Sequence, residues 1–272
     1  MKILIIGKNS RITQFLKEYL DKDFSISIRG YSEIIKKSPS YFKKYKFIIN
    51  CSSNKKYINS EYNASSDYDY KIAKKIIKLK TSYIFLSTRK VYKPKENCKE
   101  TDKLQPSCNY SKNKLISENK LKKILKSRLL ILRISNVIGV TKKNSKNKLH
   151  NTFIDIFFEN IKKGFIVKNQ KVFKDFISSK KLSQVISKLI KLNAKGTYNL
   201  SIGKKVYLDH IVQWLNYFNP NSYKIINHNK FNFNKDSFYL NNDKILKKTK
   251  IRISISNLKT ECKNISKKYF LN

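Results

Sequence analysis

The chain has 272 residues, 40% of them hydrophobic, which is enough to bury one large core or a core with a smaller lobe and excludes a disordered chain. Its formal net charge of +42 would ordinarily indicate a nucleic acid or another polyanion as partner. Nearly all the basic residues are lysines spread along the sequence, with six arginines, and specific phosphate or base recognition favours arginine. We therefore interpret the charge as a solvated surface and expect no nucleic-acid partner, while an anionic nucleotide-linked substrate stays open.

The first residues and the cysteines bear on location and metal binding. The start, MKILIIGKNS, turns polar after six residues, too soon for a signal peptide, and no run of eighteen apolar residues follows. We expect a cytoplasmic protein without a membrane span. The cysteines form no CxxC pair and have no histidine at metal-ligand spacing, so we expect reduced thiols and no metal. The four are Cys51, Cys98, Cys108 and Cys262.

Apolar strands alternate with amphipathic helices in the first half of the chain. Strands are predicted at residues 2–7, 24–28, 46–50, 83–87 and 129–134. Helical spacing of apolar residues follows the first strand, and further helices are predicted at 68–79 and 111–125. This order predicts an α/β fold with a doubly wound parallel sheet of Rossmann type, covered by helices on both faces.

The pattern changes after residue 138. Residues 139–151 form a polar, basic stretch that is compatible with a plain surface loop or with a lid over a substrate. The predicted elements that follow are a helix at 153–161, a helix at 181–192, a strand at 196–202, a helix at 208–217 and a final helix. The strand at 196–202 is expected to return to the main sheet.

The turn after the first strand, GKNSRIT, stands where a dinucleotide-binding fold holds phosphates. Glycines there let the backbone approach the ligand, and the helix N-terminus supplies positive potential. The spacing matches G-x-x-G-x-x-G, but Ser10 and Thr13 replace the second and third glycines, and only Gly7 is kept. The stretch is not a P-loop. It is compatible with a cofactor site and with an ordinary strand-to-helix turn.

The end of the second predicted strand bears on which dinucleotide would bind. An acidic residue there would hold a ribose hydroxyl and favour NAD, whereas an arginine suits the 2′-phosphate of NADP. The residue is Arg29. If the turn binds a dinucleotide, NADP is therefore favoured over NAD.

Tyr110 and Lys114 are four residues apart at the start of a predicted helix, in the stretch CNYSKNKLISENK. This spacing puts both side chains on one helix face. An ammonium close to a tyrosine favours the phenolate, and such a pair can donate or accept a proton near neutral pH. Because tyrosine and lysine are both frequent in this chain, the spacing alone does not exclude coincidence.

Five stretches, in the same order, resemble the extended short-chain dehydrogenases/reductases, the NAD(P)-dependent sugar-nucleotide epimerases, dehydratases and reductases. They are KILIIGKNSRIT, EYNASSDYDYKIAKKI, YIFLSTRKVY, PSCNYSKNK and LRISNVIG. FKDFISSKKLSQVI and GTYNLSIGKKVYLDHIV extend the resemblance over most of the chain. Each stretch alone is unspecific, whereas the set is specific.

The resemblance implies a role for each matching residue. Tyr110 would exchange a proton with the sugar's hydroxyl or keto oxygen, and Lys114 would tune it and hold the nicotinamide ribose. Thr88 would hydrogen-bond the same oxygen, unless its hydroxyl serves the backbone at the strand end. Asn136 would line the nucleotide-sugar pocket or cap a turn. The implied cofactor-binding residues are Gly7, Ser10, Arg11, Ile12, Arg29, Asn63 and Lys114.

The resemblance also implies a division into domains. Residues 1–140 would form the NAD(P)-binding Rossmann domain, with 175–202 returning to it. Residues 141–174 and 203–272 would form a small substrate-binding α/β lobe. Relatives of this kind suggest a homodimer.

The residues after Thr88 indicate the reaction. Dehydratases of the family usually carry an Asp-Glu pair there, whereas this chain has Arg89 and Lys90. The resemblance therefore implies reduction or epimerisation of a keto-sugar nucleotide, with products for surface polysaccharides. The GK opening and Thr88 look most like the dTDP-4-dehydrorhamnose reductase branch, whereas SNVIG looks closer to the general epimerases and dehydratases.

Departures from the family pattern keep a second hypothesis open. The later glycines of the turn are missing, and Lys174 stands where the family usually has arginine. A noncatalytic nucleotide-binding or scaffold protein on the same fold would tolerate both changes. The retained Thr88, Tyr110 and Lys114 favour the enzyme.

Overall fold

The structure, a computed structural model, describes residues 1–140, 152–168, 172–227 and 237–271. Its central element is a six-stranded sheet in which every neighbouring pair is parallel. In spatial order the strands are β2 (Ser25–Arg29), β1 (Lys2–Ile6), β3 (Phe47–Asn50), β4 (Ser82–Thr88), β5 (Leu129–Ile134) and β10 (Gly196–Leu200). The predicted α/β class and parallel sheet are confirmed.

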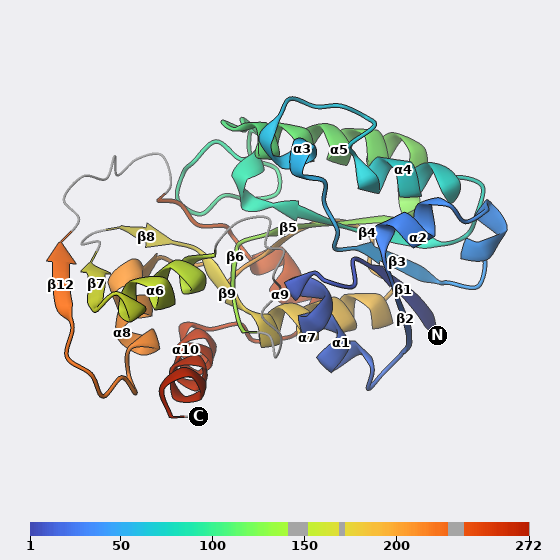
Figure 1. Cartoon of the computed structure of the whole chain (residues 1–272). Coiled ribbons are helices and arrows are strands. Elements are labelled where there is room, and N and C mark those ends of the chain that lie inside the picture. The colour runs from blue at the N-terminus through green and yellow to red at the C-terminus, as the bar shows by residue number, and fades with distance from the viewer. Residues whose placement is uncertain (141–151, 169–171, 228–236, 272) are drawn as a thin grey trace.

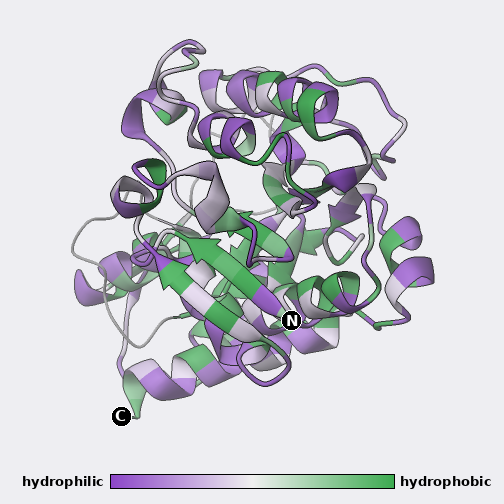
Figure 2. Cartoon of the chain, turned by 90° about the vertical axis from the view of Figure 1, so that its right-hand side faces the viewer, coloured by the Kyte–Doolittle hydropathy of each residue, from purple (hydrophilic) through white to green (hydrophobic). Residues whose placement is uncertain are grey.

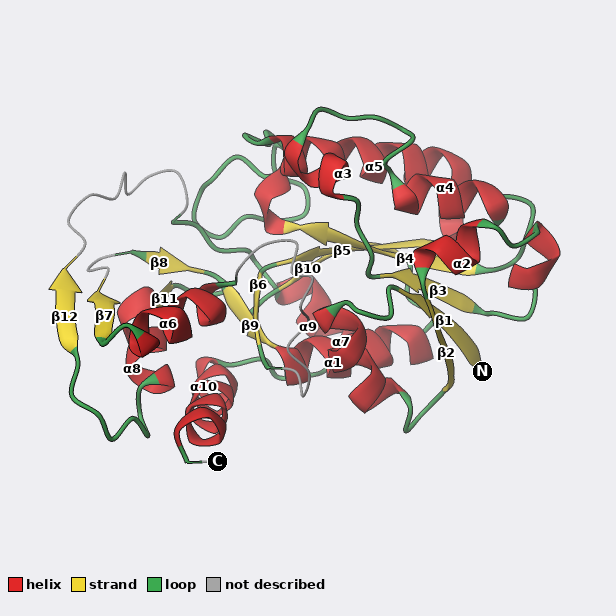
Figure 3. Ribbon diagram, viewed as in Figure 1, coloured by secondary structure: helices red, strands yellow, loops and turns green. Residues whose placement is uncertain are grey.

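Side chains alternate along the strands and give the sheet two apolar faces. In β1, Ile3 and Ile5 face one side and Leu4 and Ile6 the other, and all four are fully buried. The first face packs against α1 (Arg11–Leu20) and α7 (Ser179–Lys191). The second packs against α2 (Tyr31–Ile35), α4 (Tyr68–Lys75) and α5 (Asn109–Leu125). Figures 1 and 3 show the three layers, and Figure 2 shows the hydrophobic strands in the middle.

The strand order changes direction at β1. The chain passes from β1 to β2 on one side, and β3, β4 and β5 follow on the other. Ligands of such sheets bind outside the carboxyl ends of the strands at this switch point. The shorter helices that complete this part are η1 (Pro39–Phe42), α3 (Lys55–Asn59), η2 (Arg89–Val91) and η3 (Lys126–Arg128).

The remaining elements lie mostly on the left of Figure 1. They are β6 (Asn136–Ile138), α6 (Phe153–Lys162), β7 (Phe165–Lys168), β8 (Phe173–Lys174), β9 (Phe176–Ser178), β11 (Val206–Tyr207), α8 (Leu208–Leu215), β12 (Lys224–Asn227), α9 (Asp243–Thr249) and α10 (Ile255–Phe270). They pair as two parallel ladders, β6 with β9 and β7 with β12, and one antiparallel ladder, β8 with β11. Helix α9 packs against β10 and α7, beside the large sheet.

Several boundaries differ from the sequence-based expectations. Helix α5 begins at Asn109, two residues before the predicted start, because Cys108 and Ser111 form a capping box. Between the helices predicted at 153–161 and 181–192, the structure has the short strands β8 and β9 on either side of Asp175. From residue 141 to 151, the predicted loop or lid lies outside the described residues. The proposed division into two domains stays a prediction.

Candidate active site

The turn from β1 to α1 closes with one residue in the left-handed region. Gly7 has φ +113°, and a Cβ there would lie 2.9 Å from the Ser52 nitrogen. Any other residue would therefore be strained and would collide with the backbone that follows β3. The kept glycine lets this turn approach the neighbouring strand end at the switch point.

Ser10 and Thr13, which replace glycines of the pattern, make different contacts. Ser10 precedes α1, and its side chain caps no backbone N–H, so the first N–H groups of the helix have no side-chain cap. Thr13 is 1% exposed, and its hydroxyl donates to the Gly7 carbonyl oxygen at 2.7 Å. The larger residue at the third position is thus accommodated by a bond within the turn. Ile12 lies half-buried beside it.

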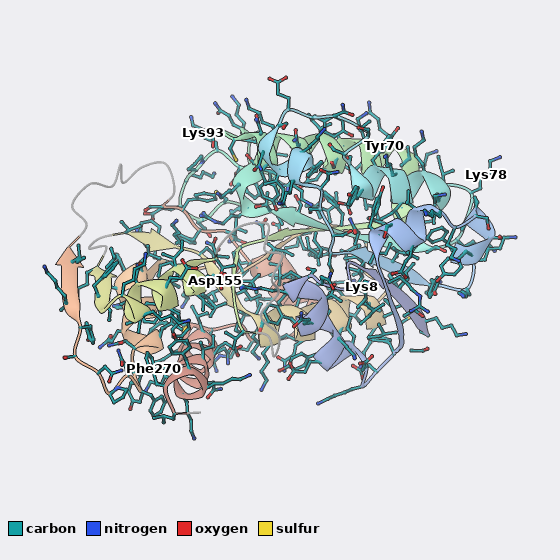
Figure 4. The ribbon with its side chains drawn as sticks, viewed as in Figure 1. Lys8, Tyr70, Lys78, Lys93, Asp155 and Phe270 are labelled. Atoms are coloured by element: carbon teal, nitrogen blue, oxygen red, sulfur yellow. The ribbon has the colours of Figure 1, made fainter. Side chains whose placement is uncertain are left out.

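Arg11 directs its side chain away from the strand ends. Its Nη2 lies 2.6 Å from Asp155 Oδ1, and its Nη1 donates to Thr152 Oγ1 at 3.0 Å. Thr152 and Asp155 form the capping box at the start of α6, and Figure 4 shows Asp155 on this helix. The guanidinium of Arg11 therefore ties α1 to α6, which leaves its backbone as the part that a ligand of the turn could meet.

Two further predicted cofactor residues lie on the surface. Arg29 ends β2 and is exposed, with Nη1 donating to the Ile28 carbonyl oxygen at 2.8 Å. Asn63 lies in the turn between α3 and α4 and not on a helix, where its side chain accepts from the Ser65 nitrogen at 2.8 Å. Arg29 has the position expected of a 2′-phosphate contact, whereas Asn63 stabilises its own turn.

Thr88 and Tyr110 flank the carboxyl edge of the sheet from two elements. Thr88 is the last residue of β4, is 8% exposed and accepts a hydrogen bond from the Lys90 nitrogen at 3.3 Å. This bond matches the backbone-capping role that was its alternative, but it leaves the hydroxyl proton for another acceptor. Tyr110 lies half-buried in the first turn of α5, which packs against β4 and η2.

Lys114 follows Tyr110 by one turn and points into the protein. Its Nζ lies 3.8 Å from Asp69 Oδ2, with both side chains 7% exposed, and 4.5 Å from the centre of the Phe85 ring. Sequence reasoning did not identify Asp69, which lies in the first turn of α4. Its signal was present, since the chain has only 18 acidic residues and two of them begin this helix.

A buried polar network fixes α5 against the sheet. Glu118 is fully buried and accepts bonds from Ser87 Oγ at 2.6 Å and Arg133 Nη2 at 2.7 Å. Arg133 also donates to Tyr92 Oη at 2.8 Å, and Tyr92 donates in turn to Asn199 Oδ1 at 2.7 Å. These contacts join α5 to β4, β5 and β10. The Ser87 hydroxyl is therefore structural.

Asn136 lies where β6 meets β9. Its Nδ2 donates to the Asp175 carbonyl oxygen at 2.8 Å. Asp175 is completely buried and accepts from the Leu240 nitrogen at 2.8 Å, while its Oδ1 has no partner among the described residues. Burial raises the pKa of Asp175 to about 7. Neighbouring Arg89 stacks its guanidinium on the Phe238 ring, with 4.0 Å from Cζ to the ring centre.

Two surface hollows lie on the α1 side of the molecule. One, of about 290 Å³, lies between Arg11, Asp155 and Tyr269, and the other lies between α1 and α7. Neither is lined by Thr88, Tyr110 or Lys114. Within the described ranges, no group of three or more His, Cys, Asp or Glu side chains could hold a metal ion. No helix there is both long and apolar enough to cross a membrane.

Comparison with known proteins gives a clear result for structure alone. No family model matches the sequence, and no curated protein does. A UDP-N-acetylglucosamine 4-epimerase from Methanobrevibacter ruminantium, in complex with UDP-N-acetylmuramic acid, is similar with a TM-score of 0.80 at 15% identity, over 98% of this chain and 97% of that one.

Two further structures carry cofactors. A dTDP-4-dehydrorhamnose reductase from Bacillus anthracis in complex with NADP has a TM-score of 0.77 at 16% identity, over 99% of this chain and 98% of that one. A UDP-glucose 4-epimerase from Brucella ovis in complex with NAD has a TM-score of 0.78 at 14% identity, over 98% of both chains. The protein thus has the fold of these sugar-nucleotide epimerases and of this reductase, which agrees with the fold that its sequence motifs predict.

Proposed function

We propose that this protein is an NAD(P)-dependent sugar-nucleotide oxidoreductase or epimerase. The observation that carries the proposal is the placement of Tyr110 and Lys114 one turn apart on α5, beside the strand that ends in Thr88. The buried contacts of Glu118 hold this helix in place. A phenol, a cation and a second hydroxyl at the carboxyl edge of a doubly wound sheet suit proton exchange with a substrate oxygen.

A nicotinamide dinucleotide fits the turn after β1. The left-handed backbone of Gly7 brings the turn close to the end of β3, and α1 begins without a side-chain cap. Gly7 and the backbone of Ser10, Arg11 and Ile12 would hold the pyrophosphate, and Lys114 the nicotinamide ribose. A bound nicotinamide would supply or accept the hydride.

NADP is favoured over NAD by one residue. Arg29 is exposed at the end of β2, where an adenine-ribose 2′-phosphate would lie. The similar structures contain NADP in the reductase and NAD in the epimerase, so both cofactors remain part of the proposal. The surface position of Asn63 assigns it at most a minor contact.

The three site residues divide the proton chemistry. In the reductive direction, Tyr110 would give its phenolic proton to the oxygen of a keto sugar, while the carbon of that carbonyl receives the hydride, and an alcohol forms. In the oxidative direction, the phenolate would take the proton back. The Thr88 hydroxyl oxygen accepts the Lys90 N–H, so the hydroxyl can donate its own proton to the same substrate oxygen. Epimerisation would use both directions on one sugar.

The substrate would be a keto-sugar nucleotide for surface polysaccharide synthesis. Among the similar structures, one epimerase is bound to UDP-N-acetylmuramic acid. Asn136 would present its amide oxygen to the nucleotide sugar, because its Nδ2 is used by Asp175. A homodimer completes the proposal on the strength of the family resemblance.

The test begins with binding and continues with turnover. NADPH and NADH are titrated into the purified protein while nicotinamide fluorescence is followed, and keto-sugar nucleotides are then screened for oxidation of the bound cofactor. We expect saturable binding, and in Tyr110→Phe an unchanged affinity with turnover lower by about 10²–10⁴-fold. Turnover that survives in Tyr110→Phe would overturn the assigned role of the tyrosine.

Two observations favour the second candidate, a noncatalytic nucleotide-binding or scaffold protein. Lys114 is directed at Asp69, and Arg11 is held by Asp155, so two residues expected at a cofactor have partners within the chain. If the folded protein binds neither NADPH nor NADH, the enzyme proposal fails and this candidate stands.

A further inference from the structure

We propose that Asp69 is a positioning residue that holds the ammonium of Lys114 in the interior of the protein and offsets the effect of its charge on Tyr110. This inference rests on the proposed function for its purpose, but the contact itself does not depend on turnover. It adds a residue of α4 to a site otherwise built from β4 and α5.

The geometry of the pair is that of a buried ionic contact. Lys114 Nζ and Asp69 Oδ2 are 3.8 Å apart, and each side chain is 7% exposed. The other carboxylate oxygen, Asp69 Oδ1, accepts the Tyr83 hydroxyl proton at 2.7 Å. Helices α4 and α5 pack side by side above the sheet (Figure 1), so both partners come from rigid elements.

The second nearby carboxylate, that of Asp67, is hydrogen-bonded to groups other than Lys114. Asp67, the N-cap of α4, accepts bonds from the Tyr70 nitrogen, Ser117 Oγ and Tyr62 Oη at 2.9, 2.6 and 3.0 Å. Asp69 is therefore the carboxylate that faces Lys114. The rings of Phe85 and Tyr57, with centres at 4.5 and 5.6 Å from Nζ, complete the surroundings of the ammonium.

The charge state of Asp69 follows from its neighbours on every packed element. Its pKa is raised to about 6 because burial, and to a smaller degree the charge of Asp67, outweigh the opposing effects of Lys114 and the Tyr83 hydrogen bond. The Cys51 thiol, just after β3, lies close enough to interact with the charges of Asp69 and Lys114. Above pH 6 the carboxylate thus forms and balances Lys114, whereas below pH 6 the ammonium is left without this partner.

The pair has a consequence for the tyrosine one turn away. A lysine favours the phenolate by its positive charge, and a carboxylate within about 4–6 Å of the lysine cancels much of that effect at a distance. Replacing Asp69 by asparagine keeps the shape and removes the negative charge. Removal of that charge is then expected to favour the Tyr110 phenolate.

The experiment measures Tyr110 directly, without turnover. Tyrosine labelled with ¹³C at Cζ is titrated by NMR in the wild-type protein, and the Tyr110 signal is assigned by its loss in Tyr110→Phe. We expect the midpoint of Tyr110 at lower pH in Asp69→Asn, and unchanged in Asp21→Asn, which removes one exposed acidic charge from the end of α1. Equal Tyr110 midpoints in the wild type and Asp69→Asn would overturn the proposal.

A second measurement covers the case in which Asp69→Asn does not fold. The ¹³C carboxyl signal of Asp69 is titrated in the wild type and in Lys114→Met, and the midpoint is expected at higher pH once the ammonium is gone. An unchanged Asp69 midpoint would refute the pairing. Absence of cofactor turnover, in contrast, would refute the proposed function while leaving both titrations interpretable.

Discussion

The starts of helices α1 and α5 both stand at the carboxyl edge of the sheet, but they are built in different ways. At α1, a single left-handed glycine and a hydrogen bond from Thr13 to the Gly7 carbonyl oxygen shape the turn. At α5, the side chains of Tyr110 and Lys114 are backed by the buried contacts of Glu118. The first site depends on backbone conformation and the second on side-chain identity.

Under the proposed function, this difference explains why the glycine pattern is degraded before α1 while the tyrosine and lysine of α5 are kept. A phosphate at a helix N-terminus is bound by backbone N–H groups, which every residue except proline supplies, so Ser10 can replace a glycine. Proton exchange needs a particular functional group at a particular place, and no backbone group replaces the Tyr110 phenol or the Lys114 ammonium.

The most severe way to break the second site is to remove the charge of Glu118. In Glu118→Gln, Arg133 keeps its burial but loses its anionic partner, and a buried charge left without its partner costs about 3–5 kcal/mol of unfolding free energy. Urea unfolding followed by circular dichroism measures this loss. The matched control is Glu61→Gln, an exposed glutamate, which should stay within about 0.5 kcal/mol.

If Glu118→Gln proved as stable as the control, the network would not be what fixes α5. Its Tyr92 and Ser87 contacts would then be sufficient for Arg133 and the helix. The distinction between a side-chain-dependent and a backbone-dependent site would lose its energetic support.

Sequence patterns predicted the sheet and the site in unequal measure. Continuous apolar runs predicted β1, β3, β4 and β5, because these strands are buried on both faces. The edge strand β2, which has no fully buried residue, was predicted from its alternating sequence. The motifs placed Thr88, Tyr110 and Lys114 at strand and helix ends. They did not reveal Asp69 or Asp155, because the contacts of these residues join segments far apart in the chain, Asp69 with Lys114 and Asp155 with Arg11.

The short strands were not predicted from the sequence either. β6, β8 and β11 have two or three residues each, too few for a periodic signal, and their pairing is set by tertiary contacts. Asn63 shows the same limit at the level of a side chain. The resemblance implies a cofactor contact for this residue, and its motif gives no sign that Asn63 Oδ1 accepts the Ser65 N–H within a turn.

Asp175, between the short strands β8 and β9, gives a prediction for the pH dependence of stability, with an effect of intermediate size. Burial raises the pKa of Asp175 in the folded protein to about 7, from an ordinary value of 3.8. The folded state therefore binds this proton more tightly than the unfolded chain, so the contribution to stability is complete below about pH 4 and is lost as the pH rises through 7. Asp175→Asn removes the titrating group and should be stabilised relative to the wild type at pH 8.

Thermal unfolding of both proteins between pH 4 and 8 checks this prediction for Asp175. The difference in melting temperature should grow with pH and level off above pH 7, and Asp21→Asn, at the exposed end of α1, should show no such growth. A constant difference across this range would mean that Asp175 keeps its ordinary acidity when folded, and that the Leu240 N–H satisfies its charge.

The prediction with the smallest expected effect concerns Thr13, in the first turn of α1. Thr13→Val keeps the shape of the side chain but removes the hydroxyl that bonds to the Gly7 carbonyl oxygen, at a cost of about 1 kcal/mol in unfolding free energy. The cost is modest because the same oxygen also accepts the Ser10 N–H at 2.9 Å. Thr260→Val, an exposed threonine on α10, is the control.

If Thr13→Val weakens NADPH binding by more than its stability loss accounts for, the Thr13 hydroxyl shapes the turn for the phosphate. Equal affinity would show that Gly7 and the helix N–H groups suffice, which is what a backbone-built site requires.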